Sequence, residues 1–368
     1  MKIAQSLTIA TTALLACGFV YSDDFRSLVG AKTGSPVRNG SQVEQFAQAE
    51  GEPKVPATDA KQPQPAAAEE RKPEDVLASA TEKLRGYSSV RTKISEKVVM
   101  KSGLTPQTFR FGATGEYLQG QNLKLKMSIE VKLTPELTGK LKEVCDGELL
   151  WSSYELGSKD KTEITRRDVR QILKALDELQ QGARLPASEK SIQQAGLIGT
   201  LGLGGLPALL TGLEKDFEFK KLTTEKIDDR EVLTLEGTWN AAWTAQLMER
   251  MYGNKKPKKE KDKPAEPLPP NIPDVVRVSI DKQTEFPRRI EYLKRTTGQT
   301  VLSPLMQIDF TEPKFNERLS RDEFVFFVPN DAKPRDDTQQ YLQRIGALKA
   351  PPAGGAGAAP VRAPEKTK

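Results

Sequence analysis

The side chains that carry out most enzymatic chemistry are scarce in this sequence. It contains no histidine, which excludes histidine-based triads, histidine general bases and histidine metal ligands. Its two cysteines, Cys17 and Cys145, are too few for a structural zinc site, which takes about four Cys or His ligands. We therefore expect no metal site. We also expect no internal disulfide, because Cys17 falls in a predicted export signal.

Acidic residues are plentiful, but their positions favour turns over catalysis. Asp228-Asp229 and Asp336-Asp337 are adjacent pairs in predicted turns, where carboxylates commonly accept local hydrogen bonds. The glycines between Gly202 and Gly205 do not have the spacing of a nucleotide-binding loop, and no lysine follows them. We predict a protein that is not an enzyme, with no catalytic residues and no cofactor.

The net charge of +6 does not indicate a nucleic-acid-binding protein. The 56 basic and 50 acidic residues are mixed along the chain. A nucleic-acid interface usually gathers Lys and Arg with aromatic residues on one face. The predicted strands show no such pattern, so we expect no nucleic-acid partner.

Composition divides the chain into four parts. Residues 1–22 combine Lys2 with a short apolar stretch and predict an export signal. Residues 23–72 and 350–368 are rich in Gly, Pro, Ala and polar residues, which predicts a disordered linker and a disordered tail. Residues 73–349 form the predicted folded domain, with a Lys- and Pro-rich insertion at 253–270 that is interpreted as a solvated loop.

Two processing sites compete in the predicted signal. Residues 14–17 read Leu-Leu-Ala-Cys, the form of a lipobox, in which Cys17 would carry a lipid and tether the protein to a membrane. Val20-Tyr21-Ser22 fits an ordinary signal peptidase site, with cleavage after Ser22. Both alternatives predict an exported protein of the periplasm or cell envelope.

The folded region is predicted to combine a few helices with an antiparallel sheet. A helix is expected over 74–86, where Pro73 and two acidic residues mark the first turn. Alternation is clearest between Leu123 and Leu133, where every odd position is apolar, as in a strand with one buried face. A second helix is expected over 168–181, and Asp146-Gly147 predicts a hairpin turn. Further strands are expected at 90–100, 109–117, 143–151, around 164, and at 217–222, 232–239, 276–280, 286–292, 306–310 and 324–329.

Two stretches carry a family resemblance. CDGELLWSSYEL (145–156) and DFTEPKFNERLSRDEFVFFVPNDAKPRDD (309–337) resemble the LolA/LolB-like superfamily of periplasmic lipoprotein carriers. The order of the N-terminal helix and three strands is also similar to that superfamily. The resemblance implies an α+β fold, in which a strongly curved antiparallel sheet forms an incomplete β-barrel and helices cover the concave face. It also implies a cavity for acyl chains, or the sensing of lipoproteins in envelope-stress regulation.

The uncharged stretch Ala195 to Leu213 is long enough to cross a bilayer. Its many glycines and Pro207 argue against a spanning helix, and it lies between segments of one predicted sheet. Core packing is an alternative. We favour the interpretation that this stretch is a mobile lid that covers an apolar groove.

We expect this protein to bind a lipid or the acyl chain of a lipoprotein, as a monomer, for lipoprotein sorting or transport. The alternative is a sensing or regulatory module that uses the same face to bind an envelope protein. The expected ligand-binding residues come from the sheet and from the lid: Ile94, Val98, Phe109, Phe111, Leu125, Met127, Ile129, Trp151, Leu201, Leu206, Leu209, Leu210 and Leu213.

Overall fold

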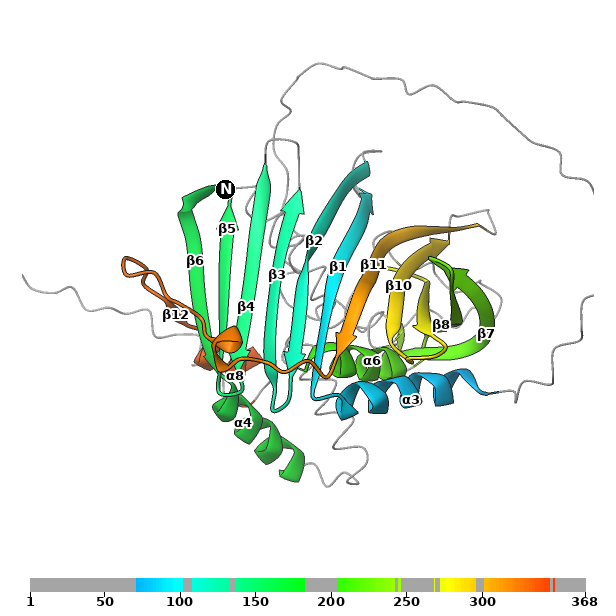
Figure 1. Ribbon diagram of the computed structural model, residues 1–368, viewed down its shortest axis with the longest axis horizontal. Coiled ribbons are helices and arrows are strands. Elements are labelled where there is room, and N and C mark those ends of the chain that lie inside the picture. Colours follow the sequence, from blue (N-terminus) through cyan, green and yellow to red (C-terminus); the bar gives the residue numbers. More distant parts are fainter. Residues whose placement is uncertain are drawn as a thin grey trace, which may run out of the picture.

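The computed structural model describes residues 71–101, 108–132, 137–182, 204–241, 244–245, 268, 272–295, 301–344 and 347. The predicted export signal, linker and tail lie outside these residues, as does the predicted insertion except for Leu268. The described residues form one large sheet with helices at one end (Figure 1). None of the described helices is long and apolar enough to cross a membrane.

The sheet has twelve strands and consists of two meanders joined side by side. The first meander pairs consecutive antiparallel strands. Its strands are β1 Ser89–Lys101, β2 Thr108–Gly120, β3 Lys124–Lys132, β4 Thr138–Asp146, β5 Leu149–Leu156 and β6 Ser158–Asp168. The second meander is antiparallel as well. It contains β7 Phe217–Ile227, β8 Arg230–Trp239, β9 Val275–Asp281, β10 Pro287–Arg295 and β11 Leu302–Phe315.

Pairing of β1 with β11 joins the two meanders, for example at Ile94 opposite Phe310. The short strand β12, Arg335–Asp336, pairs in parallel with β6. The strand order ends with β12 on one side and β7 on the other, so the sheet does not close into a barrel. The predicted α+β fold with an open, antiparallel sheet is therefore confirmed.

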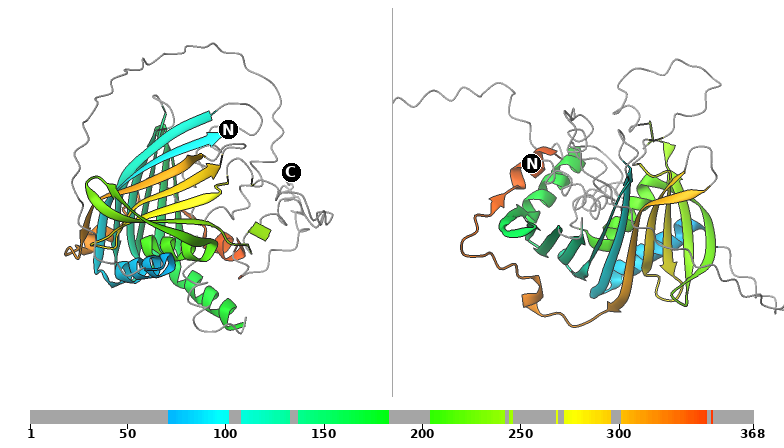
Figure 2. Two further views of the ribbon diagram at one scale, coloured as in Figure 1. Left: turned by 90° about the vertical axis from the view of Figure 1, so that its right-hand side faces the viewer. Right: turned by 90° about the horizontal axis from the view of Figure 1, so that it is seen from above.

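The two faces of the sheet have different surroundings. We call the face that carries Ile94, Tyr117 and Leu125 the inner face, and the opposite one the outer face. The sheet curves around helix α6, Gly205–Asp216, while α3, Pro73–Gly86, lies along the end of the sheet (Figure 2). The main core joins side chains of α3 and α6 to the inner face of β8–β11, including Leu77, Leu210 and Val278. Helices thus cover part of the concave face, as expected.

Two further helices pack together beside β6. Asp168 caps α4, Val169–Gly182, because its Oδ1 accepts a hydrogen bond from the Gln171 amide at 2.9 Å. The apolar side chains of α4 and of α8, Thr338–Arg344, belong to the main core. The predicted helix over 168–181 is confirmed.

The last part of the chain corrects one prediction. Residues 324–329 were expected to form a strand, but Arg321–Phe324 is a 3-10 helix and residues 325–334 are irregular. We call residues 316–334 the strap. The strap leads from β11 across the sheet to β12 (Figure 1). Its Phe324 is buried on the outer face against Leu118 and Val144. The aromatic run therefore covers the sheet instead of extending it.

Candidate functional site

The inner face of the first meander carries a separate apolar group, which we call the Ile129 cluster. It consists of Ala113, Met127, Ile129, Val131 and Leu141, which are only 2–7% exposed. Phe111 packs against it. Within the part of the chain that the structure describes, all of these side chains come from strands β2, β3 and β4, and no helical residue joins them.

Glu96 lies on the border between the Ile129 cluster and the main core. In the register of the sheet, Glu96 of β1 stands opposite Ala113 of the cluster on one side and Ile308 of the main core on the other. Its side chain is 2% exposed, and its Oε1 has no hydrogen-bond partner. Burial raises the pKa of Glu96 to about 8, so that the carboxyl group is neutral at pH 7.

A second buried carboxyl group, Glu143, lies on the β4 side of the cluster. Glu143 stands opposite Met127 on β3 and opposite Ser152 on β5. Its Oε1 accepts a hydrogen bond of 3.1 Å from the Ser152 hydroxyl, while its Oε2 has no partner. Burial raises the pKa of Glu143, against a smaller opposite effect of Arg167.

Helix α6 begins where it meets the same face. The Tyr117 hydroxyl donates to Gln119 Oε1 at 2.5 Å and accepts from the Leu206 amide at 2.9 Å. Gly205 has a φ of 60°, and a Cβ atom there would overlap the Tyr117 hydroxyl. Burial raises the pKa of Tyr117 above its usual range, so this hydroxyl keeps its proton. Tyr117 therefore fixes the start of α6 on β2.

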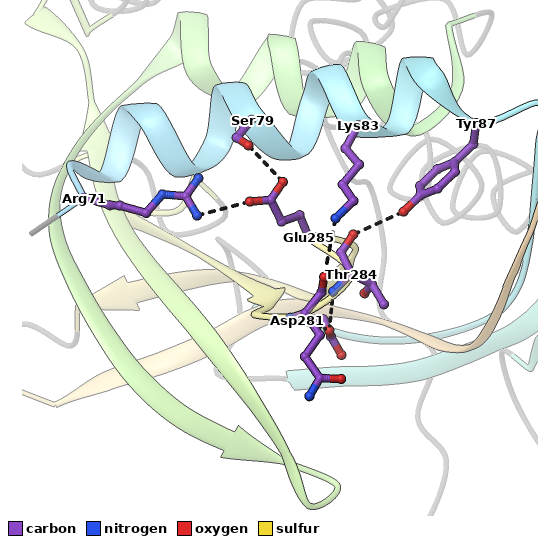
Figure 3. Close-up of polar contacts among 8 residues, drawn as sticks. Arg71, Ser79, Lys83, Tyr87, Asp281, Thr284 and Glu285 are labelled. Carbon is purple, nitrogen blue, oxygen red and sulfur yellow. Dashed lines mark hydrogen bonds and ion pairs between the residues drawn. The ribbon is translucent and has the colours of Figure 1, made fainter. Parts of the chain in front are cut away.

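The polar network around Glu285 holds α3 on the turn between β9 and β10 (Figure 3). The Glu285 carboxylate accepts hydrogen bonds from Arg71 at 3.1 Å and from Ser79 at 2.9 Å. Tyr87 donates to the Thr284 carbonyl oxygen at 3.3 Å. Both carboxylate oxygens of Glu285 have partners within the fold, which gives this cluster a structural role.

Most of the predicted lining residues lie on the inner face, but they divide between two groups. Phe111, Met127 and Ile129 belong to the Ile129 cluster. Ile94 and Leu125 belong to the main core, and Val98 is buried on the same face opposite Phe111. The side chain of Phe109 lies outside the described residues.

Trp151 was expected to line the same surface, and this prediction is wrong. In the register of the sheet it stands opposite Val144, whose side chain packs on the outer face. The Trp151 ring stacks on Phe326 of the strap, with ring centroids 5.4 Å apart. Successive side chains of a strand point to opposite faces, and Trp151 alternates with the inner residues Leu150 and Ser152.

The described part of the predicted lid is helix α6. Leu206, Leu210 and Leu213 lie in the main core, and the partly buried Leu209 packs against it. Leu201 lies outside the described residues. These leucines pack with α3, whereas the Ile129 cluster contains no residue of α6.

The sequence interpretation missed Glu96 and Glu143. A signal for Glu96 was present, because it stands two residues from both Ile94 and Val98 and so occupies an apolar position of β1. Glu143 similarly stands between Leu141 and Cys145 on β4. In both strands an acid occupies a position where alternation calls for an apolar residue.

Comparison with known proteins gives matches among solved structures only. No protein-family model and no curated protein matches this sequence. The chain is similar to the Mycobacterium tuberculosis lipoprotein LppX, with 14% identity over 68% of this chain and 98% of LppX, and a TM-score of 0.33. It is also similar to a LolA superfamily protein from Nitrosomonas europaea, with 11% identity over 70% of this chain and 98% of that protein, and a TM-score of 0.22.

A third match is the Pseudomonas aeruginosa MucA/MucB complex, with 11% identity, a TM-score of 0.28, and coverage of 69% of this chain and 61% of that one. The matched structures also include a putative outer membrane lipoprotein-sorting protein domain from Vibrio parahaemolyticus, with 9% identity over 68% of this chain and 95% of that one, and a TM-score of 0.25. The TM-scores are below 0.5, so the proposals below rest on the geometry of the described residues.

Proposed function

We propose that this protein binds a lipid, or the acyl chain of a lipoprotein, against the Ile129 cluster and carries out no catalysis. The observation that supports the proposal is a buried, wholly strand-borne apolar surface beside a carboxyl group with a free oxygen. Transfer of an acyl chain to such a surface contributes about 0.8 kcal/mol per buried methylene. Apolar contact alone could therefore supply much of the affinity.

A role in lipoprotein sorting or transport would place the protein in the periplasm or cell envelope. The apolar stretch and the lipobox form of residues 14–17 support export, either with a lipid on Cys17 or with cleavage after Ser22. The mass of the protein from its native membrane fraction separates these alternatives. A diacylglycerol adduct on Cys17 supports a tether, and a chain that begins at Asp23 contradicts it.

The binding proposal can be tested by displacement of a fluorescent fatty acid from the full chain. Ile129→Trp fills the surface and is expected to abolish uptake, whereas Ser128→Trp adds the same bulk on the exposed outer face of β3 and leaves uptake unchanged. Near-UV circular dichroism checks that both variants fold. The proposal fails if the unmodified protein takes up no probe, or if the two variants bind equally.

A second function, as a sensing or regulatory module, is supported by a different surface. Phe327 of the strap is 76% exposed, and Val325 on the same segment is also exposed, although large apolar side chains usually avoid water. A stoichiometric protein partner from the cell envelope, lost on Phe327→Ser and retained on Ile129→Trp, would favour this alternative. The reverse pattern would favour the lipid-binding function.

A further inference from the structure

We infer that Glu96 is the polar recognition point of the inner face, and that it selects amphipathic ligands with a neutral head group, such as an ester, amide or alcohol, over ionised ones. This inference rests on the proposed lipid-binding function and specifies the ligand class. It concerns a residue on β1 that borders the Ile129 cluster.

The position of Glu96 makes an unpartnered oxygen costly unless something else satisfies it. Ala113 and Ile308 stand on either side of Glu96, and Ile94 and Val98 flank it along the same face of β1. All four neighbours are apolar and buried, so none can donate a hydrogen bond to Oε1. A buried polar atom without a partner is energetically unfavourable, because it has lost its hydrogen bonds to water. A polar group of a ligand could remove this cost.

The surroundings of the Glu96 carboxyl group favour its protonated, uncharged form. Among the described residues of β2 and β11, which pair with β1, the inward titratable side chain is Tyr117. Farther along the inner face lie Tyr292 on β10, Glu143 on β4 and Arg167 on β6. Lys93 and Lys97 of β1 alternate to the outer face and are exposed. Burial is the sole cause of the raised pKa of Glu96, and no described cation lowers it.

A protonated carboxyl group has both a donor and an acceptor to offer. It can donate to the carbonyl oxygen of an ester or amide and accept from a hydroxyl. An ionised carboxylate head group, in contrast, would have to leave water beside Glu96, where burial alone shifts the pKa and no cation among the described residues acts. Glu143 on the β4 side adds a second buried acid to the same surface.

The test compares three probes of equal chain length on the full protein at pH 7: methyl decanoate, decanol and decanoate. Each competes with an environment-sensitive fluorescent acyl probe. The unmodified protein is expected to bind the ester and the alcohol about tenfold more tightly than the anion, because of the cost of desolvating a charge. Glu96→Gln keeps the size and the hydrogen-bonding groups and should retain this preference. Glu96→Leu should weaken the ester and the alcohol about fivefold while leaving undecane, which has no polar group, unaffected.

Dependence on pH supplies a readout that a purely structural role would not give. Affinity for methyl decanoate should be constant up to about pH 7 and fall above the pKa of Glu96, about 8, as the donor proton is lost. Glu96→Gln should show no such fall. Glu130→Gln, on the exposed outer face of β3, serves as the matched control.

The outcomes separate the inference from the proposed function. If no probe and no undecane binds, the lipid-binding function itself fails. If the probes bind but decanoate equals methyl decanoate, or Glu96→Leu binds the ester as well as the unmodified protein does, the lipid-binding function stands and the role of Glu96 is overturned. Circular dichroism on Glu96→Leu excludes loss of fold as the cause, and Glu96→Gln keeps the test decisive if Glu96→Leu does not fold.

Discussion

Two parts of the inner face have the same alternating sequence pattern but different partners. On β8–β11 the inward side chains, such as Leu235 and Ile290, join α3 and α6 in one core. On β2–β4 some inward side chains, namely Tyr117, Leu125 and Cys145, also join the main core, while the others form the Ile129 cluster, which among the described residues consists of strand residues only. Alternation therefore predicts which side chains are buried, but it does not predict what covers them.

The contrast suggests a division of labour within one sheet. A surface that packs against helices of the same chain contributes to stability, while a surface that no described helix joins is a candidate for exchanging its apolar contacts for those of a ligand. Glu96 marks the border between the two regions, because it stands opposite Ala113 of the Ile129 cluster and opposite Ile308 of the main core. The four predictions below test this division, from the largest expected effect to the smallest.

The largest expected effect is the contribution of Glu96 to the pH dependence of stability. Burial raises the pKa of Glu96 from 4.5 to about 8, so the unfolded chain loses this proton at lower pH than the folded protein. Stability should then fall as pH rises, by about 1.4 kcal/mol per unit, or roughly 4 kcal/mol between pH 5 and pH 8. Glu96→Gln should reduce this slope in urea unfolding, leaving the part that comes from other buried acids such as Glu143, and Glu130→Gln should leave the slope unchanged. Parallel pH profiles for Glu96→Gln and the unmodified protein would contradict the burial of an unpaired acid.

Truncation of the helical cover should mainly reduce stability. Leu210 of α6 is fully buried, so Leu210→Ala should lower the free energy of unfolding by about 3 kcal/mol. Lys215→Ala on the exposed side of the same helix should change it by less than about 0.5 kcal/mol. Leu141→Ala in the Ile129 cluster should lower acyl-probe affinity, which Leu210→Ala should leave within about twofold. Equal loss of acyl-probe affinity in Leu141→Ala and Leu210→Ala would mean that the two regions do not differ in function.

Glycines in the two regions allow a matched comparison of close packing. A Cβ atom at Gly115 on β2 would overlap the backbone oxygen of Ser128, whereas one at Gly237 on β8 would press against the Phe219 side chain at 2.9 Å. Backbone cannot move aside as a side chain can, so Gly115→Ala should cost about 2 kcal/mol and Gly237→Ala less. Thermal unfolding of both variants measures the difference, and the opposite order would show that β2 and β3 are less rigidly paired than the two strands β7 and β8.

The smallest effect concerns the strap on the outer face. Trp151 and Phe326 stack with an interplanar angle of 2°, and such pairs couple by about 1 kcal/mol. A double-mutant cycle with Trp151→Ala and Phe326→Ala in urea should recover this coupling. Additive losses would mean that the strap rests on the sheet without contributing specific packing, unlike the helices on the inner face.

Much of the fold could be predicted because local rules dominate in the hairpins. Asp146-Gly147 predicted a turn, and there Gly147 has a φ of 99° and Asp146 accepts hydrogen bonds from the amides of Glu148 and Leu149. Asp228-Asp229 likewise forms the turn between β7 and β8, with both residues at positive φ. Both turns could be predicted from their own residues, without knowledge of distant parts of the chain.

The remaining features depend on contacts between distant segments. The run Phe324–Phe327 fits a strand by composition, but Phe324 and Phe326 pack across the outer face on Val144 and Trp151, which no local pattern indicates. Trp151 was assigned to the wrong face, although its position next to the inner residue Leu150 determines the face. Glu96 was overlooked because a charged residue in a strand is normally taken as a solvent-facing one.

Pairing between β1 and β11 has a consequence for how the protein reaches its folded state. The first meander is built from neighbouring strands that follow one another closely in the sequence. In the second meander β8 and β9 are separated by residues 240–274, and residues 94 and 310 must meet across a much longer separation still. Closure of so long a loop is entropically unfavourable until many contacts compensate for it, and pairings of this kind fold slowly. The seam between the meanders is therefore expected to form late, and until then the free edges of β1 and β11 are the sites at which two copies of the chain could wrongly associate.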